Sequence, residues 1–157
     1  MNTQTTWRRF AQLSGSDRVS VLGAAVVLIA TWTALRVVGF RRWKNLLEHT
    51  LRDANPPASS DPALLAQAVH LTRLYSATAR HLFLRTNCLE RALALYFLLR
   101  RRGLPAELRF GARKQAAQLE AHAWVVCRGV ALDEDQGEHR HFFPFDGVRA
   151  LVETLPD

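Results

Sequence analysis

The sequence is of one-domain length and has the composition of a globular protein. It has 157 residues, of which 48% are hydrophobic and 22% charged, and this balance excludes a disordered chain. The net charge is +7, which favours an acidic peptide or an anionic membrane surface as a partner. No motif of a nucleic-acid-binding class is present, so we expect no nucleic-acid partner.

The chain contains only two cysteines, Cys88 and Cys127. A secreted scaffold of this length that is held by disulfides usually has more, so the count favours a reducing, cytoplasmic compartment. No secretory signal fits the N-terminus, because the first 18 residues are polar and no small-residue cleavage site follows the apolar stretch.

Residues 19–35 form an uncharged stretch of 17 residues, the lower end of the length that spans a membrane. Three interpretations stay open: a helix buried against the domain or a partner, a helix on a membrane surface, and a membrane span. The modest hydrophobicity favours the first. Residues 35–51 are basic and amphipathic, which keeps open membrane-surface contact through 19–44. Basic residues flank the stretch on both sides and give no orientation: Arg8, Arg9, Arg18, Arg36, Arg41, Arg42 and Lys44.

A Pro- and Ser-containing stretch, DANPPASSD at 53–61, divides the chain into an N-terminal basic and apolar helical segment, 1–52, and a main domain, 62–157. A helix is predicted from Pro62 to about Arg80, because Asp61 can cap it and apolar residues recur at helical spacing.

A further helix is predicted to begin after Asn87. Asn87 is a favoured N-cap, and Glu90 three residues later completes a capping box. Three arginines at 100–102 suit the C-terminal end of the helix dipole, Gly103 ends the helix, and Pro105 prevents it from resuming.

After Pro105 the spacing of apolar residues changes from the repeat of a helix to the two-residue repeat of a strand. Residues 106–110 alternate as in a half-buried strand, 112–120 are polar and are predicted to be a loop, and 121–127 with 130–133 are predicted to form a hairpin about Arg128-Gly129. The tail from 141 is expected to add a strand or a short helix. Helices followed by an antiparallel sheet predict an α+β domain.

Cys88 and His122 are the candidate nucleophile and base. Cys88 falls in the first turn of its helix, where free N–H groups and the helix dipole stabilise a thiolate. His122 falls on a predicted strand, with Trp124 and Val126 on the same face. Each residue alone is more commonly a packing residue. Together, in this order, they have the parts that a Cys–His pair requires.

An acid is needed to orient the imidazole, and the cluster Asp133, Glu134 and Asp135 follows on the partner strand. A three-residue hairpin loop pairs His122 with Glu134, whereas a two-residue loop pairs it with Asp135 and places Asp133 diagonally on the same face. We prefer Glu134, then Asp133. The cluster can equally be a solvated turn.

The remaining candidates carry less weight. Cys127 lies on the strand face opposite His122 and is interpreted as a packing residue. His139 and His141 lie two residues apart without nearby thiols, which is a weak metal signal. We therefore expect no metal and no cofactor.

The stretch RTNCLERALALYFLLRRRGLPAELRFGARKQ, followed by AHAWVV, resembles the transglutaminase-like cysteine peptidases of lasso-peptide biosynthesis, the McjB-like family. The shared features are the Cys-Leu helix start, the Leu-x-x-Gly-x-Arg strand and Ala-His-Ala-Trp. The resemblance spans about residues 64–134, and the basic, apolar front segment is similar to the N-terminal region of the same proteins.

The resemblance implies a transglutaminase/papain-like core and a function. Such proteins remove the leader from a ribosomally made precursor peptide, after which an ATP-dependent, asparagine-synthetase-like cyclase closes the ring. A recognition protein binds the leader. The length of the chain leaves no room for a fused recognition domain, so a separate one is expected. The family's nucleophile and base fall on Cys88 and His122.

Two positions depart from the family pattern. The usual Asp twelve residues after the His is Glu134 here, and a Glu common after His-Ala-Trp-Val is replaced by Val126. Two other functions therefore stay open: an acyltransferase that forms an amide, and a non-catalytic protein that binds a peptide or tethers a complex to a membrane.

Overall fold

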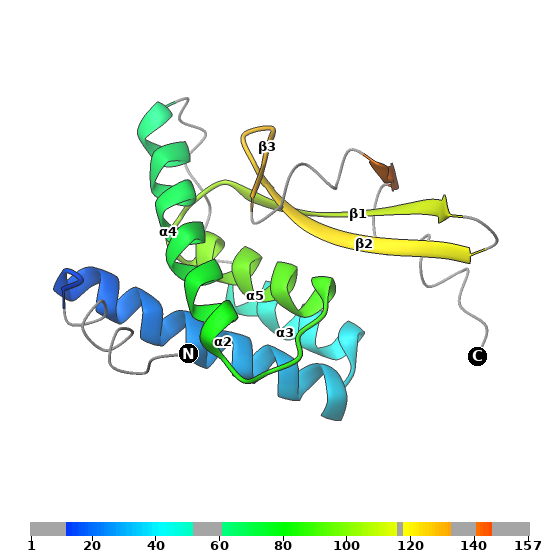
Figure 1. The fold of residues 1–157 in the computed structure, drawn as a ribbon, viewed down its shortest axis with the longest axis horizontal. Helices are drawn as coiled ribbons and strands as arrows, with labels where there is room; N and C mark the ends of the chain where they lie inside the picture. The colour runs from blue at the N-terminus through cyan, green and yellow to red at the C-terminus, as the bar shows by residue number, and fades with distance from the viewer. Residues whose placement is uncertain (1–11, 52–60, 116–117, 133–140, 146–157) are drawn as a thin grey trace.

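In the part of the chain that the structure describes, four helices pack with one small antiparallel sheet. The computed structural model describes residues 12–51, 61–115, 118–132 and 141–145. Figure 1 shows α5 lying between α2 and the sheet, with α4 crossing at one end. The predicted α+β fold, with helices packed on a small antiparallel sheet and a helix at the N-terminal side, is confirmed. The elements are α2 Gly15–Val37, α3 Phe40–Thr50, α4 Pro62–His81, α5 Cys88–Arg101, β1 Ala106–Gln115, β2 Gln118–Cys127, β3 Val130–Leu132 and β4 Phe143–Phe145, and the strand order is β3-β2-β1-β4.

The N-terminal helix α2 has one face in the core. Ala24 and Leu28 are at most 1% exposed and belong to the same apolar cluster as Leu71 of α4 and Leu95 of α5. The helix is also long and apolar enough to cross a membrane by length and composition. The described part of the predicted N-terminal segment therefore packs on the rest of the chain, and the division at 53–61 stays a prediction.

Local capping sets where α4 and α5 begin. Asp61 accepts a hydrogen bond from the Ala63 N–H at 2.8 Å. At the start of α5, the Asn87 side chain accepts from the Glu90 N–H and the Glu90 carboxylate accepts from the Asn87 N–H, each at 2.9 Å. Gly103 adopts a φ of 71° just beyond α5. The predicted caps, capping box and helix stop are confirmed.

The predicted loop at 112–120 is wrong, because β1 and β2 extend through most of it as a hairpin. Their register runs from Ala106 opposite Cys127 to Gln115 opposite Gln118. The polar composition suggested a loop, but a hairpin that projects from the core can expose both of its faces. An ion pair between Arg113 and Glu120, opposite each other in the register, links the two strands at 2.7 Å.

The hairpin between β2 and β3 is confirmed, with the shorter of the two loops. Cys127 pairs with Val130, so the loop is Arg128-Gly129, and both residues have positive φ, 52° and 78°. Two left-handed residues make a type I′ turn, whose twist suits neighbouring strands. The three-residue loop, from which the pairing of His122 with Glu134 was derived, is therefore wrong.

The tail adds a strand, β4, which is one of the two structures predicted for it; the other was a short helix. β4 pairs with β1 through Phe110 opposite Phe145, Gly111 opposite Pro144 and Ala112 opposite Phe143. This pairing brings residues from the end of the chain beside the middle of the sheet, where β1 also pairs with β2.

Candidate active site

Cys88 is the first residue of α5, as predicted, and its side chain is half-buried. The capping box uses the N–H groups of Asn87 and Glu90, so those of Cys88 and Leu89 lie outside it. Free N–H groups at a helix N-terminus and the positive end of the helix dipole stabilise an anion. The position suits both a thiolate and a negatively charged oxygen.

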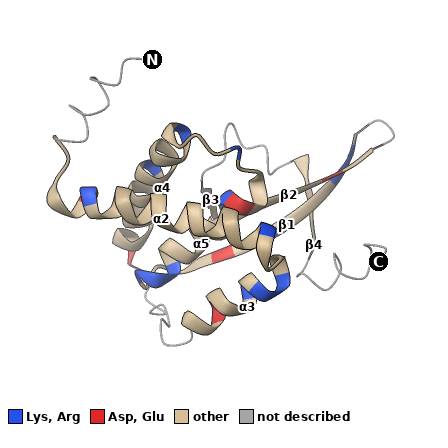
Figure 2. Cartoon of the chain, turned by 90° about the horizontal axis from the view of Figure 1, so that it is seen from below, with Lys and Arg blue, Asp and Glu red and all other residues tan. Residues whose placement is uncertain are grey.

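Cys88 faces the sheet side of α5. The Glu90 side chain points to α2, where it contacts Arg36. Residues two apart on a helix are separated by about 200°, so Cys88 points away from α2. The sheet lies on that side: α5 packs against β1 and β2, and Figures 1 and 2 show the beginning of α5 next to β2.

Glu90 is a buried carboxylate that anchors the start of α5. It is 2% exposed, and Arg36 of α2 donates to its Oε1 at 2.5 Å. The Arg36 guanidinium also lies 4.0 Å from the centre of the Trp32 ring. A buried carboxylate requires such a partner, so α2 holds the N-terminal turn that carries Cys88. Sequence reasoning named Arg36 only as a charge that flanks the stretch 19–35 and missed its pairing with Glu90.

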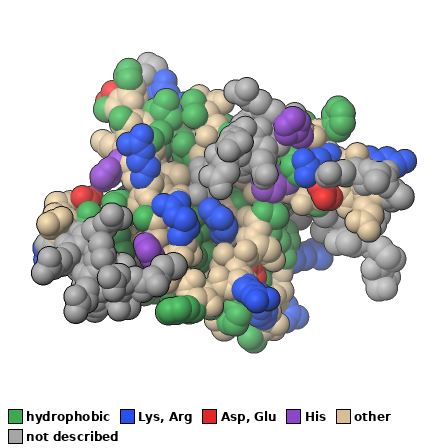
Figure 3. All heavy atoms as spheres, in the orientation of Figure 1, with side chains coloured by type: hydrophobic (Ala, Val, Ile, Leu, Met, Phe, Trp, Pro, Cys, Tyr) green, Lys and Arg blue, Asp and Glu red, His purple; other side chains and the backbone are tan. Residues whose placement is uncertain are grey.

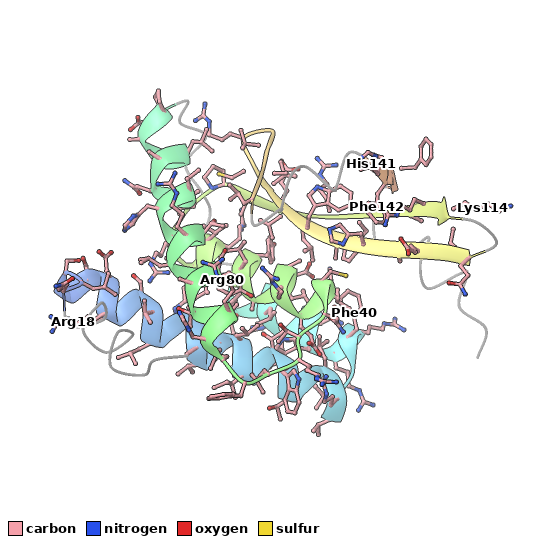
Figure 4. All side chains as sticks on the ribbon, viewed as in Figure 1. Arg18, Phe40, Arg80, Lys114, His141 and Phe142 are labelled. Carbon is pink, nitrogen blue, oxygen red and sulfur yellow. The ribbon has the colours of Figure 1, made fainter. Side chains whose placement is uncertain are left out.

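His122 lies in β2 within an aromatic stack. Its ring is 5.9 Å from that of Trp124 and 4.9 Å from that of Phe142, with interplanar angles of 18° and 28°. Alternation along the strand places His122 on the face opposite Ala123, which is in the core. Figure 4 shows Phe142 at the β4 end of the sheet, and Phe40 on the helical side. The stack fixes the plane of the imidazole.

Gly111 makes room for this stack. It lies opposite His122 in the β1–β2 register. A Cβ at Gly111 would lie 2.9 Å from Cη2 of Trp124 and 3.0 Å from Cβ of Phe142, closer than side chains pack. Sequence reasoning gave Gly111 no role of its own, although it is the glycine of the Leu-x-x-Gly-x-Arg strand. Phe142 was missed because it reaches His122 only through the fold.

Cys127 is a packing residue, as predicted. It is 0% exposed within the core cluster, and burial raises the pKa of its thiol above the ordinary value of 9.0. It lies five positions along β2 from His122 and therefore on the opposite face. Cys88 is thus the more accessible of the two free thiols.

The predicted acids lie outside the described residues, as does His139. Asp133, Glu134 and Asp135 follow the end of β3, and the observed two-residue loop is the one for which the sequence pairs Asp135 with His122. The identity of the acid and the pairing of Cys88 with His122 stay predictions. Within the described residues, no group of three or more His, Cys, Asp or Glu side chains is arranged to hold a metal, and His141 is exposed.

A half-buried thiol at a helix N-terminus beside a sheet that carries a histidine is an arrangement suited to acyl transfer through a thioester. A family model described as the transglutaminase-like superfamily matches residues 25–145. The chain belongs to the transglutaminase-like superfamily, whose members are commonly cysteine peptidases or acyltransferases. No curated protein and no solved structure matches it.

Proposed function

We propose that this chain is a cysteine peptidase that removes the leader from a ribosomally made precursor peptide during lasso-peptide maturation. The observation that carries the proposal is Cys88 at the capped N-terminus of α5, on the side of that helix that faces the sheet. The superfamily supports the class of chemistry. The substrate rests on the resemblance of the motifs around Cys88 and His122.

In the proposed reaction, the Cys88 thiolate attacks the carbonyl carbon of the leader–core amide. The carbon–sulfur bond forms, the carbon–nitrogen bond breaks, and protonated His122 gives its proton to the leaving amine. His122 then takes a proton from water as the water oxygen attacks the thioester carbon. The carbon–sulfur bond breaks, which regenerates the Cys88 thiolate and releases the leader, whose new carboxyl group loses its proton to solvent. The Cys88 N–H stabilises the negatively charged oxygen in both steps.

In this proposal the two groups meet around the outer edge of β2, because Cys88 lies on the helical side of the sheet and His122 on its opposite face. β3 pairs with β2 only at residues 125–127, so among the described residues no strand covers the edge at His122. The beginning of α5 lies next to β2, as both ribbon views show. An acid from the segment after β3 would orient the ring. The preference from sequence was Glu134 and then Asp133, whereas the observed two-residue loop favours Asp135 or Asp133.

The surface charge suits an acidic leader or an acidic partner. The chain has a net charge of +7, and in Figure 3 Lys and Arg side chains are spread over the face shown, with few Asp or Glu among them. We further propose a separate leader-recognition protein and an ATP-dependent, asparagine-synthetase-like cyclase as partners, in the cytoplasm.

The test uses the purified full chain, its leader-recognition protein and the precursor peptide encoded beside its gene, with mass spectrometry of the products. We expect Cys88→Ala to lose leader removal by at least about a thousandfold, and Cys127→Ala, the matched removal of a buried thiol, to retain it. An active Cys88→Ala variant would overturn the proposal.

Product masses separate the alternatives. Addition of water supports hydrolysis, whereas loss of ammonia or a crosslink would make the chain an amide-forming acyltransferase. Binding of the precursor without turnover would make it a non-catalytic binding protein.

A second measurement tests the geometry alone. The short bifunctional alkylating agent 1,3-dibromoacetone should join Cys88 to His122, and peptide mapping would identify the crosslink. Alkylation of Cys88 without a crosslink would contradict the pairing of Cys88 with His122, whatever the substrate is.

A further inference from the structure

One face of α2 is apolar and exposed along its length. Exposed side chains recur three, four and eight residues apart, which places them on one side of a helix. The buried residues of α2, among them Ala24 and Leu28, are centred on the opposite side. The members of this α2 stripe are Val19, Leu22, Val26, Ile29 and Val37, which are 68%, 59%, 65%, 44% and 76% exposed.

Basic residues bound the α2 stripe at its two ends. Arg18 precedes it and Arg36 lies near its end, with no charged residue between them. Arg41 and Arg42 are exposed at the start of α3. Figure 2 shows α2 in tan between charged segments at its two ends, with blue segments at the start of α3. An apolar face bordered by arginines is complementary to an anionic lipid surface.

Polar contacts along α2 tie it to the rest of the fold. The Asp17 carboxylate contacts the His70 ring at 2.9 Å, Arg102 donates to the Ser20 hydroxyl at 3.0 Å, and Arg36 pairs with Glu90 at 2.5 Å. A helix that crossed a bilayer would lose these contacts and would separate Ala24 and Leu28 from their core. The contacts therefore favour a helix that lies along a membrane surface over one that spans it.

We propose that the α2 stripe binds an anionic lipid bilayer, with α2 parallel to the membrane plane and the exposed Arg18, Arg41 and Arg42 among the lipid headgroups. The sheet and the beginning of α5 lie on the other side of α2 (Figure 1), so Cys88 and His122 would face the aqueous side. This inference is independent of the reaction proposed above.

The experiment is co-sedimentation of the full chain with phosphatidylcholine vesicles that contain or lack phosphatidylglycerol. We expect binding to the anionic vesicles that weakens with salt, and a loss of at least about tenfold in the double variant Leu22→Gln/Val26→Gln. The matched control is Leu119→Gln, which changes a 77% exposed leucine on β2 away from the stripe. Circular dichroism establishes that each variant folds.

Four outcomes would overturn the proposal. The wild type could stay in the supernatant with anionic vesicles, or Leu119→Gln could weaken binding as much as the double variant. Light scattering could show a wild-type dimer that the double variant converts to a monomer, so that a second copy covers the stripe. Resistance of the cellular protein to extraction by alkaline carbonate would indicate a membrane span.

Discussion

At the scale of single residues, Glu90 connects the stability of the fold to the position of the candidate nucleophile. One of its oxygens caps α5 through the Asn87 N–H, and the other accepts from Arg36. The carboxylate is almost completely buried while the side chain of Arg36 is 44% exposed. Removing the charge of Arg36 and removing the charge of Glu90 should therefore have different effects on the stability of the fold.

Arg36→Ala should destabilise the protein more than Glu90→Gln. The first leaves a buried carboxylate without its cation, which costs about 3–5 kcal/mol in fully buried pairs and about 1–3 kcal/mol here, since Arg36 is half in solvent. The second retains a capping side chain and leaves an arginine that is half in solvent and still stacks on Trp32. Urea unfolding measures both, and equal losses would contradict this account of Glu90.

Gly111→Ala should destabilise the protein by about 1–3 kcal/mol, the usual cost of overpacking, and should lower activity by displacing the rings that stack on His122. The matched control is Gly23→Ala in α2, where an added Cβ meets nothing within 4 Å and should stabilise the helix by up to about 1 kcal/mol. Thermal unfolding and activity of the two variants test the role of Gly111, and unchanged activity in Gly111→Ala would contradict it.

At the scale of elements, α2 is held at its N-terminal end by Asp17. The pKa of the Asp17 carboxyl lies below its ordinary value of 3.8. The hydrogen bond with His70 of α4 is the larger cause, and the hydrogen bond with Ser14 is the second. A lowered folded-state pKa means that the contact favours folding above about pH 3.8 and that this contribution is lost as the pH falls below it.

His70→Ala should therefore raise the pKa of Asp17 back toward 3.8. The measurement is an NMR titration of the Asp17 carboxyl carbon in the wild type and the variant. An unchanged titration would show that the contact between α2 and α4 does not persist in solution. His49→Ala on α3, which is exposed, is the matched control and should leave Asp17 unaffected.

At the scale of the whole molecule, Cys127 reports on global unfolding. Because its buried thiol has a raised pKa, the protonated form favours the folded state below about pH 9, and this contribution is lost as the pH rises toward the folded-state pKa. In a Cys88→Ser background, alkylation of Cys127 should follow the unfolding equilibrium, and stability should fall above pH 9.

The corresponding experiment in the wild type compares the two thiols. Iodoacetamide should modify Cys88 in the folded protein near neutral pH and leave Cys127 unmodified until urea unfolds the chain. Peptide mapping after a short pulse gives both rates. Comparable rates at the two positions would contradict the burial of Cys127.

The sequence by itself determined the elements that depend on local interactions. Asn87 and Glu90 lie within one turn, and so their capping box, and with it the position of Cys88, can be predicted from spacing alone. The same holds for the start of α4 at Asp61 and for the position of the β2–β3 hairpin in the chain, though not for the length of its loop. The identity of Cys127 as a packing residue followed from strand alternation.

The tertiary structure decided what depends on segments that are far apart in the chain. The Arg36–Glu90 pair joins α2 to α5, and Phe142 reaches His122 only because β4 pairs with β1. The length of the β1–β2 hairpin and the two-residue loop were set by pairing and twist, which a polar composition does not reveal. The exposure of the α2 stripe follows because Ala24 and Leu28 on the opposite face find partners in the core, and only packing shows which face of an apolar helix is covered.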